Sequence, residues 1–155
     1  MKISQKIREM IMRWEGCRLT AYRCPAGVLT IGYGHTGPDV TEGLTITAAQ
    51  AVTLFNADVD RFAATMERIL GDTAEKLKPQ QFDALVSLAY NIGPGNFKKS
   101  TLLELVKNNP ADPVIASEFL RHSKARNQNG KFVTLPGLVR RRTEEANHYF
   151  SDDPT

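Results

Sequence analysis

The order of secondary structure follows from one segment, Glu15-Gly-Cys17-Arg-Leu-Thr-Ala-Tyr22-Arg-Cys24-Pro-Ala-Gly27-Val-Leu-Thr30-Ile-Gly32-Tyr-Gly34-His35. Before this segment, apolar residues recur at three- and four-residue steps, which predicts a helix that ends at Glu15. Within it, two β-prone runs, 19–22 and 28–31, flank the turn residues 24–27. The segment therefore predicts a helix followed directly by a hairpin.

This arrangement would gather three reactive groups. Glu15 would lie at the negative end of the helix dipole, which disfavours a carboxylate and favours the protonated form that a general acid needs. A hairpin of this length would bring the Cys24 thiol and the Thr30 hydroxyl towards Glu15, and Gly32 and Gly34 would permit close approach of the backbone. We therefore expect an acid, a thiol and a hydroxyl around one site.

Glu15, Cys24 and Thr30 are separated by eight and then five residues, and this spacing resembles the Glu–Asp/Cys–Thr signature of the phage-type lysozymes, or endolysins. The similarity extends over nearly the whole chain through further motifs, namely Glu-Gly-x-Arg-Leu-x-x-Tyr, Thr-Ile-Gly-Tyr-Gly-His, Asn56-Ala-Asp-Val-Asp60, Ala89-Tyr-Asn-Ile-Gly93 and Leu135-Pro-Gly-Leu-Val-Arg-Arg-Arg142. Several ordered motifs carry far more weight than one Glu–Cys spacing.

The remaining chain predicts helices. Thr47 and Gln50 fit a capping box that opens a long amphipathic helix ending at Gly71. Further helices are expected after Pro79, over 102–106, after Asp112-Pro113, and from Pro136 to about residue 150, with a polar loop at 126–130. Four or five helices following one hairpin predict an α+β class that is mostly helical.

The resemblance implies a single lysozyme-like domain, 1–155. An N-terminal lobe with the hairpin would occupy about 1–46, a connecting helix about 47–70 and a helical lobe about 71–155, with the cleft between the lobes.

The resemblance also implies roles for the site residues. Glu15 would protonate the leaving glycosidic oxygen, while Cys24, where many relatives carry Asp, and Thr30 would prepare the attacking water. A free thiol with a pKa of about 8.5 is only a few per cent thiolate at neutral pH. Cys24 could be a thiolate base helped by Arg18 or Arg23, could merely position water, or, less readily, could be a covalent nucleophile.

Other residues receive supporting roles from the same resemblance. His35 is expected to pair with Asp58 as a structural contact rather than to act in catalysis. Asn91, Ser100 and Thr101 are expected to contact the sugar chain, although Asn91 is also a natural helix C-cap. Of Arg140, Arg141 and Arg142, which point in different directions on a helix, Arg141 would approach the catalytic glutamate and the others would be solvated.

Composition excludes several classes of function. With 41% apolar and 24% charged residues and a net charge of +3, the chain resembles an ordinary globular domain. No apolar run approaches the ~20 residues of a membrane span, and Cys17 and Cys24 are expected to be free thiols. No metal or cofactor motif occurs. Without aromatic interleaving or a reading helix, the three arginines favour no nucleic-acid partner.

The resemblance to the phage-type lysozymes implies a monomeric muramidase that hydrolyses the β-1,4 bond between N-acetylmuramic acid and N-acetylglucosamine in peptidoglycan, without cofactor. It would be made in the bacterial cytoplasm without a signal peptide and reach the wall through a holin. Two alternatives stay open: a non-catalytic wall-binding or scaffolding module, which the Cys24 substitution keeps alive, and a chitin-cleaving glycosidase. The stereochemical outcome, the peptide-stem preference and the origin of the gene, whether phage, prophage or domesticated, are also open.

Overall fold

The computed structural model describes residues 2–152 and confirms an α+β fold that is dominated by helix. Its elements are α1 (Gln5–Glu15), β1 (Arg18–Arg23), β2 (Leu29–Gly32), β3 (His35–Thr36), α2 (Ala48–Leu70), η1 (Gly71–Lys76), α3 (Pro79–Ile92), α4 (Pro94–Lys98), α5 (Thr101–Asn108), α6 (Val114–Leu120), β4 (Lys124–Arg126), β5 (Phe132–Thr134) and α7 (Pro136–Tyr149). The chain forms two compact units, a sheet unit of residues 8–61 and a helical unit of residues up to 7 and from 62 onwards. No helix of the described residues is long and apolar enough to cross a membrane.

The sheet unit contains a three-stranded antiparallel sheet in the order β1-β2-β3. Tyr22 pairs with Thr30 across the predicted hairpin, and Ile31 pairs with His35 across the second turn. Alternation along β2 turns Ile31 into a core that also contains Phe55, while Tyr33 meets Phe55 edge to face. The sheet is therefore fixed by its hydrophobic face and by two short turns.

Helix α2 begins where the capping box predicted it. The Thr47 N–H donates to Oε1 of Gln50 at 2.8 Å, and the Gln50 N–H donates to Oγ1 of Thr47 at 3.1 Å. Two of the N–H groups that a helix start leaves without an intrahelical partner are thus satisfied by side chains three residues apart.

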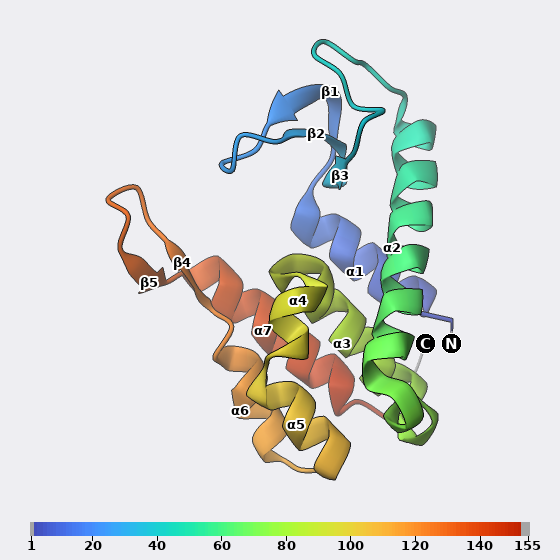
Figure 1. The fold of residues 1–155 in the computed structure, drawn as a ribbon, viewed down its shortest axis with the longest axis vertical. Coiled ribbons are helices and arrows are strands. Elements are labelled where there is room, and N and C mark those ends of the chain that lie inside the picture. The colour runs from blue at the N-terminus through green and yellow to red at the C-terminus, as the bar shows by residue number, and fades with distance from the viewer. Residues whose placement is uncertain (1, 153–155) are drawn as a thin grey trace. The chain divides into compact units, whose positions relative to one another are not determined.

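In the helical unit, α3 packs along α7, and α6 packs on the other side of α7 (Figure 1). Pro79 opens α3 at its first turn, and Gly93, with φ of 91°, ends it. The start of α1 is fixed to this packing through Asp83, whose carboxylate accepts from the Ser4 hydroxyl at 2.6 Å and lies 2.9 Å from Nε2 of His148.

Three features of the helical unit differ from expectation. The predicted polar loop at 126–130 is the tip of a second hairpin, formed by β4 and β5. The residues after Gly93 form the short helix α4, which the sequence analysis did not predict; Pro94 suits its first turn. Within the described residues, six α-helices rather than four or five follow the first hairpin.

Candidate functional site

Glu15 is the last residue of α1, as the periodicity predicted. The following Gly16 ends the helix with φ of 70°, and its N–H still donates to the carbonyl of Met12 at 2.9 Å. The Glu15 side chain is half-buried, and its Oε2 lies beside Gly34 in the turn between β2 and β3, 3.6 Å from the position a Cβ would take. The carboxyl group of Glu15 therefore faces the sheet and lies against backbone without a side chain.

Cys24 lies in the turn that joins β1 to β2. Its backbone N–H donates to the carbonyl of Val28 at 3.0 Å, and its own carbonyl accepts from the N–H of Gly27 at 2.7 Å. Hydrogen bonding to the backbone of Val28 and then of Ala26 lowers the pKa of the thiol, which outweighs the raising effect of burial. The turn itself thus favours the thiolate.

The cations considered as partners of Cys24 are engaged elsewhere. Arg23 donates to the carbonyl of Gly27 at 2.8 Å and to the carboxylate of Glu42 at 2.8 Å. The guanidinium of Arg18 lies over the ring of Tyr22, 4.6 Å from its centroid. The pKa of Cys24 is lowered by backbone dipoles, and neither arginine is among its causes.

Thr30 is 4% exposed and lies on β2 opposite Tyr22. Its hydroxyl donates to the carbonyl of Val28 at 2.9 Å, the same oxygen that accepts from the N–H of Cys24. Since a hydroxyl has one proton and two lone pairs, the Thr30 oxygen in this arrangement can still accept a hydrogen bond. It is thus suited to accept a hydrogen bond from a water molecule.

His35 lies between two carboxylates. Its Nδ1 is 2.8 Å from Oδ2 of Asp58, and its Nε2 is 2.9 Å from Oδ2 of Asp39. Burial alone would lower the pKa of His35, but the hydrogen bonds to Asp58 and Asp39 raise it overall. Both ring nitrogens face acceptors, so the imidazolium form satisfies both contacts. The ring of His35, on β3, thus contacts Asp58 on α2 and Asp39 in the loop between β3 and α2.

In the helical unit, Asn91, Ser100 and Thr101 line one pocket of 960 Å³. Ser100 also caps α5, because its Oγ accepts from the N–H of Leu103 at 3.1 Å and donates to the carbonyl of Phe97 at 2.6 Å. Its hydroxyl is thus occupied by the backbone, whereas Asn91 and Thr101 are exposed. Residues of the β4–β5 hairpin, which sequence analysis missed, also line this pocket.

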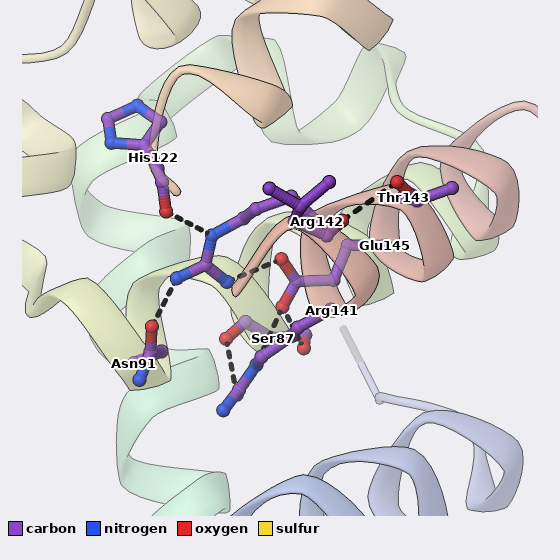
Figure 2. Close-up of polar contacts among 8 residues, drawn as sticks. Ser87, Asn91, His122, Arg141, Arg142, Thr143 and Glu145 are labelled. Atoms are coloured by element: carbon purple, nitrogen blue, oxygen red, sulfur yellow. Dashed lines mark hydrogen bonds and ion pairs between the residues drawn. The ribbon is translucent and has the colours of Figure 1, made fainter. Parts of the chain in front are cut away.

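The three consecutive arginines are not equivalent, and the expectation that two of them are solvated is wrong for Arg142. Arg140 is exposed, Arg141 is 4% exposed and Arg142 is fully buried. Arg142 is satisfied by the carboxylate of Glu145 at 2.7 Å and by the carbonyl of His122 at 2.8 Å (Figure 2). A glutamate three residues after an arginine was the local signal for this pair.

The sequence is similar to phage lysozymes and endolysins over most of its length. The family model described as phage lysozyme matches residues 12–145. The endolysin of Acyrthosiphon pisum secondary endosymbiont phage 1 is 42% identical over 146 residues, which are 94% of this chain and 95% of that protein. The endolysin of Bacillus phage PZA is 39% identical, and the matched region is 57% of its length.

Two solved structures are similar over nearly their whole length. An endolysin from Escherichia coli O157:H7 phage FAHEc1 is 35% identical with a TM-score of 0.83, covering 99% of this chain and 96% of that one. The muramidase domain of SpmX from Asticaccaulis excentricus is 32% identical with a TM-score of 0.85, covering 97% of this chain and 98% of that one.

Proposed function

The chain belongs to the phage lysozyme family, and we propose that it hydrolyses the β-1,4 bond from N-acetylmuramic acid to N-acetylglucosamine in bacterial peptidoglycan. The observation that carries the assignment to this chain's own residues is the arrangement in the sheet unit. A carboxyl group ends α1 beside Gly34, and the backbone N–H of Cys24 and the hydroxyl of Thr30 both donate to the carbonyl of Val28.

In this mechanism, Glu15 is the general acid. It gives its proton to the glycosidic oxygen as the bond to the anomeric carbon breaks, so that the leaving sugar departs with a neutral hydroxyl group. Glu15 is the last residue of α1, and its half-buried carboxyl group lies beside Gly34.

Cys24 and Thr30 act on the attacking water. The Thr30 oxygen accepts one proton of the water as a hydrogen bond, which turns a lone pair of the water towards the sugar. The Cys24 thiolate accepts the other proton as the water oxygen bonds to the anomeric carbon, and the lowered pKa of the thiol supports this role. Displacement by water from the face opposite the leaving group inverts the anomeric configuration.

The other roles follow the same proposal. Asn91, Ser100, Thr101 and Arg141 contact the substrate, and the His35–Asp58 pair is structural. The enzyme acts as a monomer, with neither cofactor nor metal. It reaches the wall after a holin opens the inner membrane.

Clearing of permeabilised Gram-negative cells tests the activity. The native protein should lower the turbidity, and Glu15→Gln, which keeps the shape but cannot give up a proton in the same way, should lose about 10²-fold or more of the rate. Analysis of the products should show reducing muramic acid ends in the inverted configuration. Turnover of chitin oligomers but not of peptidoglycan would instead identify a chitin-cleaving glycosidase.

A folded native protein that sediments with peptidoglycan without clearing cells would identify a non-catalytic wall-binding module. Light scattering coupled to size-exclusion chromatography measures the molar mass in solution and so tests whether the protein is a monomer. For holin-dependent access, cells that express the protein alone should lyse only after chloroform is added. Lysis without chloroform would contradict that route.

A further inference from the structure

Arg142 is a buried cation whose guanidinium reaches the rim of the pocket in the helical unit. Its Nε donates to the carbonyl of His122 at 2.8 Å, its Nη1 donates to Oε1 of Glu145 at 2.7 Å, and its Nη2 donates to Oδ1 of Asn91 (Figure 2). Arg142 and Glu145 are both fully buried. A charge in such a place is retained only with a fixed set of partners.

The carboxylate that fixes Arg142 is itself held from the other side. Oε2 of Glu145 accepts from the hydroxyl of Ser87, which is fully buried on α3, and from Nε of Arg141 at 3.3 Å. Both carboxylate oxygens are thus occupied, so the guanidinium of Arg142 cannot turn without leaving a buried acceptor unpaired. Arg142 is a rigid donor towards Asn91.

This rigidity decides which end of the Asn91 amide faces the pocket. A guanidinium only donates hydrogen bonds, so the oxygen of the amide must face Arg142 and its Nδ2 must face away. Asn91 is exposed and lines the pocket, and no acceptor for its Nδ2 occurs among residues 2–152. Asn91 therefore offers donors and no acceptor to whatever enters.

We infer that Arg142 is a positioning residue for substrate binding, because it commits Asn91 to donate a hydrogen bond to a carbonyl or carboxylate oxygen of the peptidoglycan. This inference rests on the proposed function. The oxygen has two possible sources, the N-acetyl carbonyl of a sugar and a carboxylate of the peptide stem. Side chains of the same pocket add further donors, namely Lys99, Arg121, Lys124 and Arg126.

The same pocket contains a matched control. Asn96 is exposed, but its Nδ2 donates to the carbonyl of Ile92 at 2.7 Å, so its oxygen is the end left for solvent. Asn91→Asp and Asn96→Asp introduce the same negative charge into one pocket. Only Asn91→Asp replaces an outward donor by an acceptor.

The experiment measures binding separately from turnover. Each variant is made in a Glu15→Gln background, and its Kd for insoluble peptidoglycan is obtained by sedimentation. With Glu15 present, kcat and KM are measured on soluble glycan strands. We expect Asn91→Asp to raise Kd and KM about tenfold, which is a typical effect of one lost hydrogen bond to a charged or fixed partner, with kcat within threefold. Asn96→Asp should change them less than threefold.

A second variant tests the role of Arg142. Lys in place of Arg142 keeps the charge opposite Glu145 but loses the planar fork that holds Asn91. We expect a KM increase of about threefold to fivefold, and little further increase when Arg142→Lys is combined with Asn91→Asp, because both changes act through one amide. Thermal unfolding of each variant establishes that it is folded. Additive effects, or equal effects of Asn91→Asp and Asn96→Asp, would overturn the inference.

Strands with and without peptides identify the oxygen. If the Asn91→Asp variant binds peptide-free strands as tightly as the protein with Asn91 does, the acceptor is a carboxylate of the peptide stem. If the tenfold penalty persists, the acceptor is the N-acetyl carbonyl. A native protein that binds peptidoglycan but releases no reducing ends would refute the proposed hydrolysis while leaving the binding comparison valid.

Discussion

Cys24 and Thr30 are joined through a single oxygen atom, the carbonyl of Val28, which accepts from the N–H of Cys24 at 3.0 Å and from the hydroxyl of Thr30 at 2.9 Å. The turn that lowers the pKa of the thiol is therefore the same structure that orients the hydroxyl. Two proposed water ligands are set by one piece of backbone.

Replacement of Cys24 tests its role as a base. Cys24→Ala should lose about 10²-fold or more in kcat, because no other group would take the proton of the water, whereas Cys24→Asp should keep much of the rate. The rate of the native protein should rise as the pH rises through the lowered pKa of Cys24, and in Cys24→Asp this rise should move to acidic pH. A pH–rate profile of each variant measures both.

Alkylation supplies the control for this prediction. The other thiol, Cys17, is exposed. Iodoacetamide should inactivate a Cys17→Ser variant as fast as the native protein and leave Cys24→Asp active. If Cys24→Ala clears cells at the native rate, the thiol has no part in catalysis.

His35 should make the free energy of unfolding depend on pH. Its pKa is raised in the folded state by Asp58 and Asp39, so folding favours the protonated ring. Its contribution is complete below the unfolded pKa of about 6.5 and is lost as the pH rises through the higher folded value. Urea unfolding at pH 5.5 and 8.5 should show that His35→Gln costs about 1–2 kcal/mol at the lower pH and less at the higher.

His122 offers a control, because its effect on the free energy of unfolding should depend on pH in the opposite direction. Burial, and then the charge of Arg142, lower its pKa, so folding disfavours its protonated form. Its effect on stability is unfavourable at low pH and disappears above the ordinary pKa. His122→Gln should therefore gain stability at pH 5.5 relative to pH 8.5. Equal costs of His35→Gln at both values would show that the imidazolium is not the stabilising form.

A side chain at Gly37 should disturb the contact between Asp39 and His35. A Cβ there would lie 2.8 Å from Oδ1 of Asp39, which would displace the carboxylate that faces Nε2 of His35. We expect Gly37→Ala to cost about 2–3 kcal/mol in urea unfolding and to weaken the pH dependence due to His35. Gly43→Ala is the control, because Gly43 has φ of 77° and open space around it, so only backbone strain of about 1 kcal/mol applies. Equal costs would refute the displacement.

Loss of the Arg142 guanidinium should be severe. Arg142→Met would leave Oε1 of the fully buried Glu145 carboxylate without a donor, while Ser87 and Arg141 would still hold Oε2. Breaking such a buried pair costs about 3 kcal/mol. Arg140→Met, two residues earlier on the exposed side of α7, should change the free energy of unfolding by less than about 0.5 kcal/mol. Denaturant unfolding of both variants measures this difference, which a solvated Arg142 would not produce.

Local signals were sufficient for much of the fold. The end of α1, the first hairpin and the start of α2 were all predicted, because each depends on residues within one or two turns, such as the reciprocal pair of Thr47 and Gln50. The second hairpin was missed although Asn129-Gly130 is a strong turn signal. Its strands have only three residues each, and charged Lys124 and Arg126 conceal the alternation.

Long-range contacts were beyond local reasoning. Three consecutive arginines predict a solvated face, but Arg142 is buried by partners 20 and 51 residues away, His122 and Asn91. The lowered pKa of Cys24 likewise comes from backbone groups of a turn whose geometry the sequence does not state. Residue types indicated the chemistry of the candidate site, whereas the folded chain determines which of them hold each other in place.

The carbonyl that joins Cys24 and Thr30 belongs to the main chain, so it survives any exchange of the Val28 side chain, which is 47% exposed. Most substitutions of Val28 in a saturation mutagenesis experiment should therefore leave the activity nearly unchanged. Proline is the exception, because it would remove the amide N–H of the turn. An engineer could use this position to attach a tag or a surface charge without disturbing the neighbouring chemistry.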